Sequence, residues 1–246
     1  MTRVPPLILG FLACDFALAI SYLGNWALNQ PSRKITFLVD LNAEASLPAW
    51  YSSIQLFLVA ALLAVFVYAE FDKRRLLSWT LPAWPLVFVL LSIDEIAQIH
   101  EWLGGKSDRW LPGRNRENIM FRTTGIWMFL IGIPFVFFMV GLILSLKKYL
   151  RGKSDVIHMF WAALIVYIGS AAGIEILSNF VPKEGAVHII QVFCEELGEM
   201  IGGTLFLWAA YKLLCSYEFS ICIAGSPMVK EASKNVLKKP ESAVRK

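Results

Sequence analysis

The residues of this sequence whose side chains are best suited to catalysis or ligand binding are acids within long apolar runs. The run from Ala186 to Leu214 carries His188, Gln191, Glu195, Glu196 and Glu199, with no lysine or arginine before Lys212. At about 100° per residue, four of these polar side chains fall on one stripe of a helix, with Glu196 beside it. A charged group at membrane depth costs roughly 2.5–3.5 kcal/mol, so such groups usually have a task and a partner.

Two earlier apolar runs end in polar residues of the same kind. The run from Leu81 ends L-S-I-D-E-I-A-Q-I-H-E, which supplies Asp94, Glu95, Gln98, His100 and Glu101. A continuous helix would place Asp94, Gln98 and Glu101 on one face, at i, i+4 and i+7. The run from Ile157 adds Glu175 near its end. Asp15 lies in the middle of the first run, and it either joins these acids or marks a misplaced boundary.

Carboxylates combined with histidines predict a metal site. Four carboxylates and two histidines form the ligand set of di-iron and di-manganese sites in helix bundles. The predicted ligands are Asp94, His100, Glu101, Glu175, His188, Glu195 and Glu199, with Glu95 and Glu196 as acid/base groups. The Glu-x-x-His spacing of di-iron sites is missing, and a zinc ion with two histidines, one carboxylate and an open position also fits. The sequence therefore does not decide whether the predicted metal is iron, manganese or zinc. Simple interfacial placement of His100 and His188 is an equal alternative.

The composition places these runs in a membrane. The 246 residues are 57% apolar and 17% charged, which is typical of a multi-pass membrane protein. Each apolar run approaches the ~20 residues that a helix needs to cross the hydrocarbon. The predicted fold is an all-α bundle of six spans, at about Val4–Ala27, Tyr51–Ala69, Leu81–Leu103, Thr124–Leu146, Ile157–Val181 and Ala186–Leu214.

The distribution of lysine and arginine predicts the orientation. Most basic residues fall on one side of the six spans, so both termini are expected in the cytoplasm. The expected location of the chain is the inner membrane of the cell. Each acid then lies about 9–16 Å below the outer boundary, at 1.5 Å per residue. Three segments far apart in sequence thus bring acids to one depth. Arg114, Arg116 and Arg122 of an outer loop are alternative partners for them.

The chain is predicted to form two parts. Residues 1–216 form the membrane domain, and residues 217–246 form a basic, mobile cytoplasmic tail, because that segment is too polar to build a core. The first 14 residues could instead be a cleaved signal, but the apolar run continues well past Cys14, which favours a retained anchor. No basic–aromatic pattern of the nucleic-acid-binding kind is present in the sequence.

Two segments of the sequence resemble those of a known group of proteins. L-S-I-D-E-I-A-Q-I-H-E (91–101) and C-E-E-L-G-E-M-I-G (194–202) resemble signature stretches of uncharacterised multi-pass bacterial membrane proteins. The resemblance covers two helices and implies no activity.

We therefore expect a metal-dependent enzyme, oxidative or hydrolytic, that acts on a lipid or small apolar molecule at the outer half of the membrane. A cation- or proton-coupled transporter is the first alternative, because carboxylate relays suit that role as well. An accessory subunit whose acids pair with a partner's arginines is the second. The oligomeric state stays open.

Overall fold

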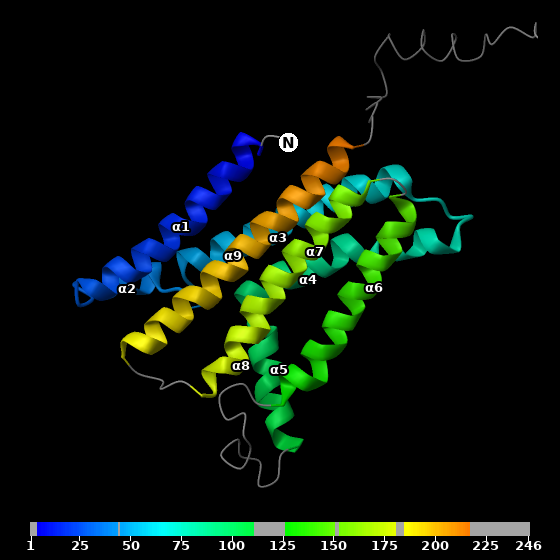
Figure 1. The fold of residues 1–246 in the computed structure, drawn as a ribbon. Helices are drawn as coiled ribbons and strands as arrows, with labels where there is room; N and C mark the ends of the chain where they lie inside the picture. The colour runs from blue at the N-terminus through cyan, green and yellow to red at the C-terminus, as the bar shows by residue number, and fades with distance from the viewer. Residues whose placement is uncertain (1–3, 44, 111–125, 151–152, 181–184, 217–246) are drawn as a thin grey trace, which may run out of the picture. The chain divides into compact units, whose positions relative to one another are not determined.

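The protein is a bundle of long helices (Figure 1). The computed structural model describes residues 4–43, 45–110, 126–150, 153–180 and 185–216, and no strand occurs within these ranges. The helices in chain order are α1 (Pro6–Ala27), α2 (Arg33–Val39), α3 (Leu47–Glu70), η1 (Leu76–Thr80), α4 (Ala83–Ala97), α5 (Ile99–Ser107), η2 (Asp108–Trp110), η5 (Met128–Gly132), α6 (Ile133–Tyr149), α7 (Ser154–Ile168), η6 (Gly169–Ile174), α8 (Glu175–Ser178) and α9 (Ala186–Cys215). The all-α prediction is confirmed.

Five helical segments of the described chain are long and apolar enough to cross a membrane. They are Pro6–Ala27, Leu47–Glu70, Leu76–Ala97, Met128–Tyr149 and Ser154–Ser178. Helix α9 has 30 residues but is not apolar enough by the same measure, because its acids and glycines lower its hydropathy. The predicted sixth helix therefore exists as a helix, and its crossing of a membrane stays a prediction.

The outer surfaces of these helices are apolar. Phe137 on α6 is 73% exposed, Ile165 on α7 is 67% exposed and Leu7 on α1 is 61% exposed. A protein surrounded by water rarely leaves so much contiguous apolar surface uncovered, whereas lipid chains would cover it at no cost. The exposed faces are therefore compatible with insertion into a membrane.

Helices α3 and α4 are joined by a reciprocal pair of serine hydrogen bonds. The Ser53 hydroxyl donates to the Ser92 carbonyl oxygen at 2.7 Å, and the Ser92 hydroxyl donates to the Ser53 carbonyl oxygen at 2.8 Å. Small hydroxyl residues allow two helix backbones to approach closely while their polar atoms stay satisfied. This contact fixes the position of α4, which ends in the acids of the 91–101 segment.

Helix α9 lies between α1 and α7 (Figure 1). On one side Thr204 of α9 donates to Asp15 of α1, and on the other side Gly202 packs directly on the backbone of Tyr167 in α7. Ring contacts continue from Tyr167 to Phe206 of α9 and from there to Phe88 of α4 and Phe160 of α7. We call Trp84, Phe88, Phe160 and Phe206 the aromatic block, and each is at most 2% exposed.

The predicted third span is wrong at its C-terminal end, because the helix breaks at Gln98. Gln98 has φ 53°, in the left-handed region, and separates α4 from α5. The Asp94 carboxylate causes this break by accepting the backbone N–H of His100 at 2.9 Å, a bond that a continuous helix would give to the chain carbonyl four residues back. Asp94, Gln98 and Glu101 therefore do not share one helical face.

Gln98→Gly is expected to raise the free energy of unfolding by about 1 kcal/mol, because glycine adopts the left-handed region without the steric cost that a side chain has there. Thermal unfolding in detergent measures the effect. Ala97→Gly is the matched control: this neighbour has a helical backbone, so the same glycine should lower stability by about 0.5–1 kcal/mol. If both variants changed the free energy of unfolding in the same direction, that result would contradict the conformational argument.

Candidate functional site

A cluster of carboxylates from three helices lies where the sequence predicted acids to meet. Glu95 comes from α4, Glu175 from α8, and Glu195 and Glu199 from α9. We call these four residues the carboxylate cluster. All four are partly buried, and Glu199 lies close enough to each of the other three for their charges to interact.

Within the cluster, the carboxyl groups of Glu175 and Glu195 are within hydrogen-bonding reach of each other. Two ionised carboxylates only accept hydrogen bonds, so such a contact needs one proton shared between the two groups. Gln191, one turn before Glu195, places its amide nitrogen 3.5 Å from Glu195 Oε2. The pair is therefore an arrangement that can hold or release a proton.

A π-helical turn positions Glu175. The segment η6 (Gly169–Ile174) joins α7 to α8 with the wider spacing of a π-helix, which rotates α8 relative to the face that α7 presents. Ser170 in this turn faces Gly198 of α9, where an added Cβ would overlap the serine side chain. Single π turns within helices are frequent at functional sites. Here the turn directs Glu175 toward Glu195.

Tyr167 borders the cluster at Glu95, and it was not among the predicted site residues. Its hydroxyl donates to Glu95 Oε1 at 3.4 Å, and its ring lies 6.2 Å from that of Phe206 in the aromatic block. The charges of Asp94, Glu95, Glu196 and Glu199 all act on it. Tyrosine counts as an apolar aromatic residue in a membrane run, so only its helical position before Glu175 could have drawn attention to it.

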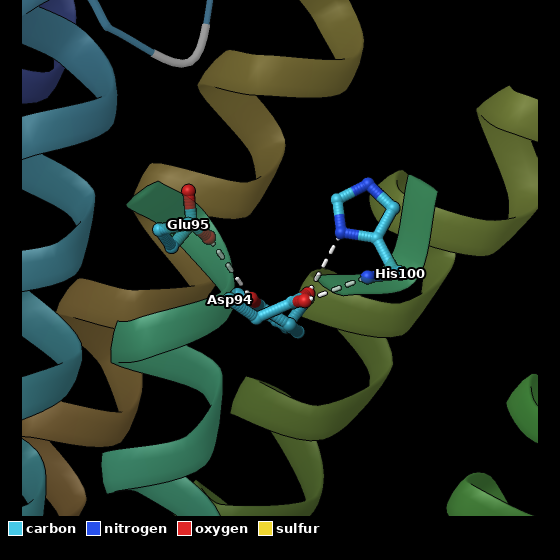
Figure 2. Close-up of polar contacts among 4 residues, drawn as sticks. Asp94, Glu95 and His100 are labelled. Carbon is cyan, nitrogen blue, oxygen red and sulfur yellow. Dashed lines mark hydrogen bonds and ion pairs between the residues drawn. The ribbon is translucent and has the colours of Figure 1, made fainter. Parts of the chain in front are cut away.

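Asp94 and His100 form an oriented pair next to Glu95 (Figure 2). His100 Nδ1 lies 2.8 Å from Asp94 Oδ2, while the His100 backbone N–H donates to Asp94 Oδ1. The two side chains are 37% and 27% exposed, and the imidazole ring also packs 5.6 Å from the Trp127 ring. A carboxylate on one ring nitrogen is how proteins orient a histidine that serves as a base or a metal ligand at the other nitrogen.

The remaining predicted site residues lie elsewhere. His188 lines a cavity against α1 and α2, together with Tyr22 and Asp40, and not the carboxylate cluster. Glu196 acts electrostatically on both Tyr22 and Tyr167, so it lies between the two sides of α9. The side chain of Glu101, the arginines at 114, 116 and 122, and the basic tail lie outside the described residues.

The described side chains do not converge as a metal site. No group of three or more histidine, cysteine, aspartate or glutamate residues is placed to hold an ion in the part of the chain that the structure describes. The acids instead pair with one another, with Tyr167 or with His100. The residues as placed therefore do not fit the predicted iron, manganese or zinc centre, and no step of the chemistry below uses one.

Asp15 belongs to a separate buried network. Its Oδ1 accepts from the Tyr51 hydroxyl at 2.7 Å and from Gln55 Nε2 at 2.9 Å, and its Oδ2 accepts from the Thr204 hydroxyl at 2.8 Å. We call these four residues the Asp15 network. Asp15 is 0% exposed and lies inside α1, so it does not mark a misplaced boundary. It does not join the other acids either, because its partners are the neutral side chains of α3 and α9.

Comparison with known proteins adds a family to this description. No curated protein and no solved structure matches the chain. A family model described as a domain of unknown function, DUF8692, matches residues 8–215, and the chain therefore belongs to that family.

Proposed function

We propose that this chain is an integral membrane enzyme that uses the carboxylate cluster as acid and base toward a lipid or small apolar substrate. The proton-sharing contact of Glu175 and Glu195 carries the proposal. Such a pair can donate a proton from one carboxyl while its partner oxygens accept one, and positioned proton transfer contributes about 10²–10⁴-fold to a reaction rate. The oriented Asp94–His100 pair, beside Glu95, supplies a second group able to exchange protons.

The position of α9 supports its assignment as the sixth span. Its contacts with Asp15 of α1 and Tyr167 of α7 lie in the interior of two segments that are apolar enough to cross a membrane. At 1.5 Å per residue a helix of this length reaches about 45 Å, more than the hydrocarbon thickness of about 30 Å. Six spans place both termini on one side, which the basic residues make the cytoplasmic side.

We infer that a substrate would reach the cluster from one side of the membrane. Phe88, Phe160 and Phe206 lie about 10 Å further along α4, α7 and α9 than Glu95, Tyr167 and Glu199, and in the same direction, because α9 runs opposite to the other two helices. The aromatic block therefore fills the interior directly beyond the acids. A one-sided site suits a substrate that enters from one leaflet and leaves by the same route.

Glu195→Gln is expected to reduce turnover at least about a hundredfold, because the amide keeps the shape of the side chain and removes its proton exchange. The measurement is mass spectrometry of lipids after incubation of purified protein in nanodiscs made from total membrane lipid. Glu70→Gln, at the end of α3 and outside the cluster, is the matched control and should retain full conversion. Identical lipid profiles with wild type, Glu195→Gln and empty nanodiscs would reject the enzyme proposal.

A proton-coupled transporter is the second candidate, because the same proton-sharing pair could load and release protons. It requires a second polar path through the aromatic block, and the inner halves of α4 and α9 offer few polar residues. Proton flux in liposomes that disappears in Glu195→Gln, without any change in lipids, would favour this candidate. Stoichiometric iron, manganese or zinc in wild type, absent from Glu195→Gln, would restore the metal-dependent form of the enzyme.

A further inference from the structure

A second candidate site lies at the beginning of α9, beside α1 and α2. It is a cavity of about 200 Å³ between the end of α1, α2 and the beginning of α9. Its principal lining residues are Tyr22, Trp26, Gln30, Asp40, Asn42 and His188. We call it the α1–α9 cavity. Its volume is below the roughly 300–1,000 Å³ of pockets for drug-sized molecules, so it fits a small group.

One side of the cavity is the side chain of Tyr22, which is held by close packing. Tyr22 is 8% exposed, and its side chain packs in a cluster with Ala19, Leu41, Val192 and Met200. Tyr22 also lines the cavity, so this packing fixes one aromatic side of it.

The wall of the cavity is held in place by the chain around it. Asn25 and Thr36 hydrogen bond each other at 3.2 Å across the α1–α2 connection. Asn29 and Gln30, in the same connection, have φ of 57° and 54°. Left-handed backbone is unfavourable for residues other than glycine, and two such residues in a row persist only where the surrounding structure requires them. The connection therefore carries Gln30 to the cavity at a conformational cost.

The charge and the aromatic groups of the cavity select a cation. Asp40 has one oxygen, Oδ1, that accepts the Asn42 backbone N–H at 3.0 Å, which leaves Oδ2 to accept from a ligand. No lysine or arginine is among the described residues that line the cavity. Tyr22 and Trp26 add aromatic rings, whose faces attract organic cations. The end of α1, where Trp26 lies, is also the level of lipid headgroups in the proposed membrane arrangement.

We propose that the α1–α9 cavity binds an organic ammonium group, carried either by a phospholipid headgroup or by a free amine. Asp40 supplies the counter-charge, and Tyr22 and Trp26 form the aromatic wall. His188 and Gln30 provide polar contacts at the rim. This assignment does not depend on the acid–base role of the carboxylate cluster, and it gives His188 a place different from the metal site predicted from the sequence.

The test uses the full-length protein in nanodiscs of phosphatidylglycerol, which carries no amine, titrated with choline chloride by calorimetry. Wild type should bind choline saturably and should not bind 3,3-dimethylbutan-1-ol, which has the same shape without the charge. Asp40→Asn should weaken binding at least about tenfold. The amide oxygen can still accept the Asn42 N–H, so this variant retains the local turn. Trp26→Leu is a second variant with the same expected direction.

Asp155→Asn, at an exposed carboxylate that pairs with Lys212 on the other end of α9, should bind choline like wild type. Nanodiscs of phosphatidylethanolamine then identify the source of the ligand. Loss of choline binding there indicates an occupying lipid headgroup, whereas unchanged binding indicates a free amine. No saturable choline binding by wild type in phosphatidylglycerol, equal binding by Asp40→Asn, or equal binding of the neutral analogue would overturn the proposal.

Discussion

Gly202→Ala is expected to separate α7 from α9 and to lower the melting temperature of the bundle clearly. A Cβ at Gly202 would lie 2.7 Å from both Cα and Cβ of Tyr167 and 2.8 Å from its backbone nitrogen. Atoms of a helix backbone cannot rotate away as a flexible side chain can, so the two helices must move apart. Overpacking of this kind costs about 1–3 kcal/mol, and a contact with backbone belongs at the upper end.

The cost of alanine at Gly202 can be compared with its cost at two other glycines of α9, Gly198 and Gly203. A Cβ at Gly198 would meet the Ser170 side chain, and a Cβ at Gly203 would lie 3.3 Å from Gln55 Oε1. Because these contacts are with side chains, alanine at Gly198 should cost less than alanine at Gly202, and alanine at Gly203 least of all. Thermal unfolding of the purified variants in one detergent measures the order.

Gly141→Ala on α6 is the matched control, because an added Cβ there would meet nothing within 4 Å. Alanine favours a helix interior over glycine by about 0.5–1 kcal/mol, so this variant should be slightly more stable than wild type. A melting temperature of Gly202→Ala at or above that of Gly141→Ala would contradict the close packing of α7 on α9. Since Tyr167 carries the contact to Glu95, the same variant should also disturb the carboxylate cluster.

The sequence predicted the long helices well, because their apolar runs are interrupted by few competing signals. The first run was expected from Val4 to Ala27, and α1 occupies Pro6–Ala27. The break at Gln98 was not predictable from periodicity. It depends on one side chain, Asp94, accepting a backbone N–H six residues later, and left-handed residues are more often glycine or asparagine.

The position of the acids along each helix was predictable, but their partners were not. Helix length fixes the depth of Glu95, Glu175 and Glu199, which is why counting along the runs brings them together. The rotation of each helix depends on packing, and here the close approach of Gly202 to Tyr167 and the π turn before Glu175 set it. His188, two turns before Glu195, lines the cavity beside α1 and α2. The assignment of the predicted site residues as metal ligands or acid/base groups stays a prediction.

Asp15→Ala is expected to destabilise the protein by about 2–4 kcal/mol, because it removes the shared acceptor of α1, α3 and α9. Three side-chain donors lose their acceptor. A hydrogen bond between membrane helices contributes about 0.6 kcal/mol on average, so three lost bonds alone account for about 2 kcal/mol. The cavity left by the carboxyl group adds to that loss. Thermal unfolding in detergent measures it, with Asp155→Ala as a surface control that should stay within about 0.5 kcal/mol of wild type.

A double-mutant cycle distinguishes a shared network from independent contacts. Asp15→Asn keeps the shape of the side chain but offers only one acceptor oxygen. Its amide nitrogen faces either the Gln55 amide nitrogen, as a donor facing a donor, or the Thr204 hydroxyl, which then loses its acceptor. Thr204→Val removes one of those donors and also the acceptor that Gln55 Nε2 reaches at 2.7 Å. If the four residues act together, the double variant should be less destabilised than the sum of the two single variants by about 0.5–3 kcal/mol. Strict additivity would instead mean that Asp15 holds each helix separately, and α1 would then depend on the rest of the bundle mainly through the apolar packing of Tyr22 and its neighbours.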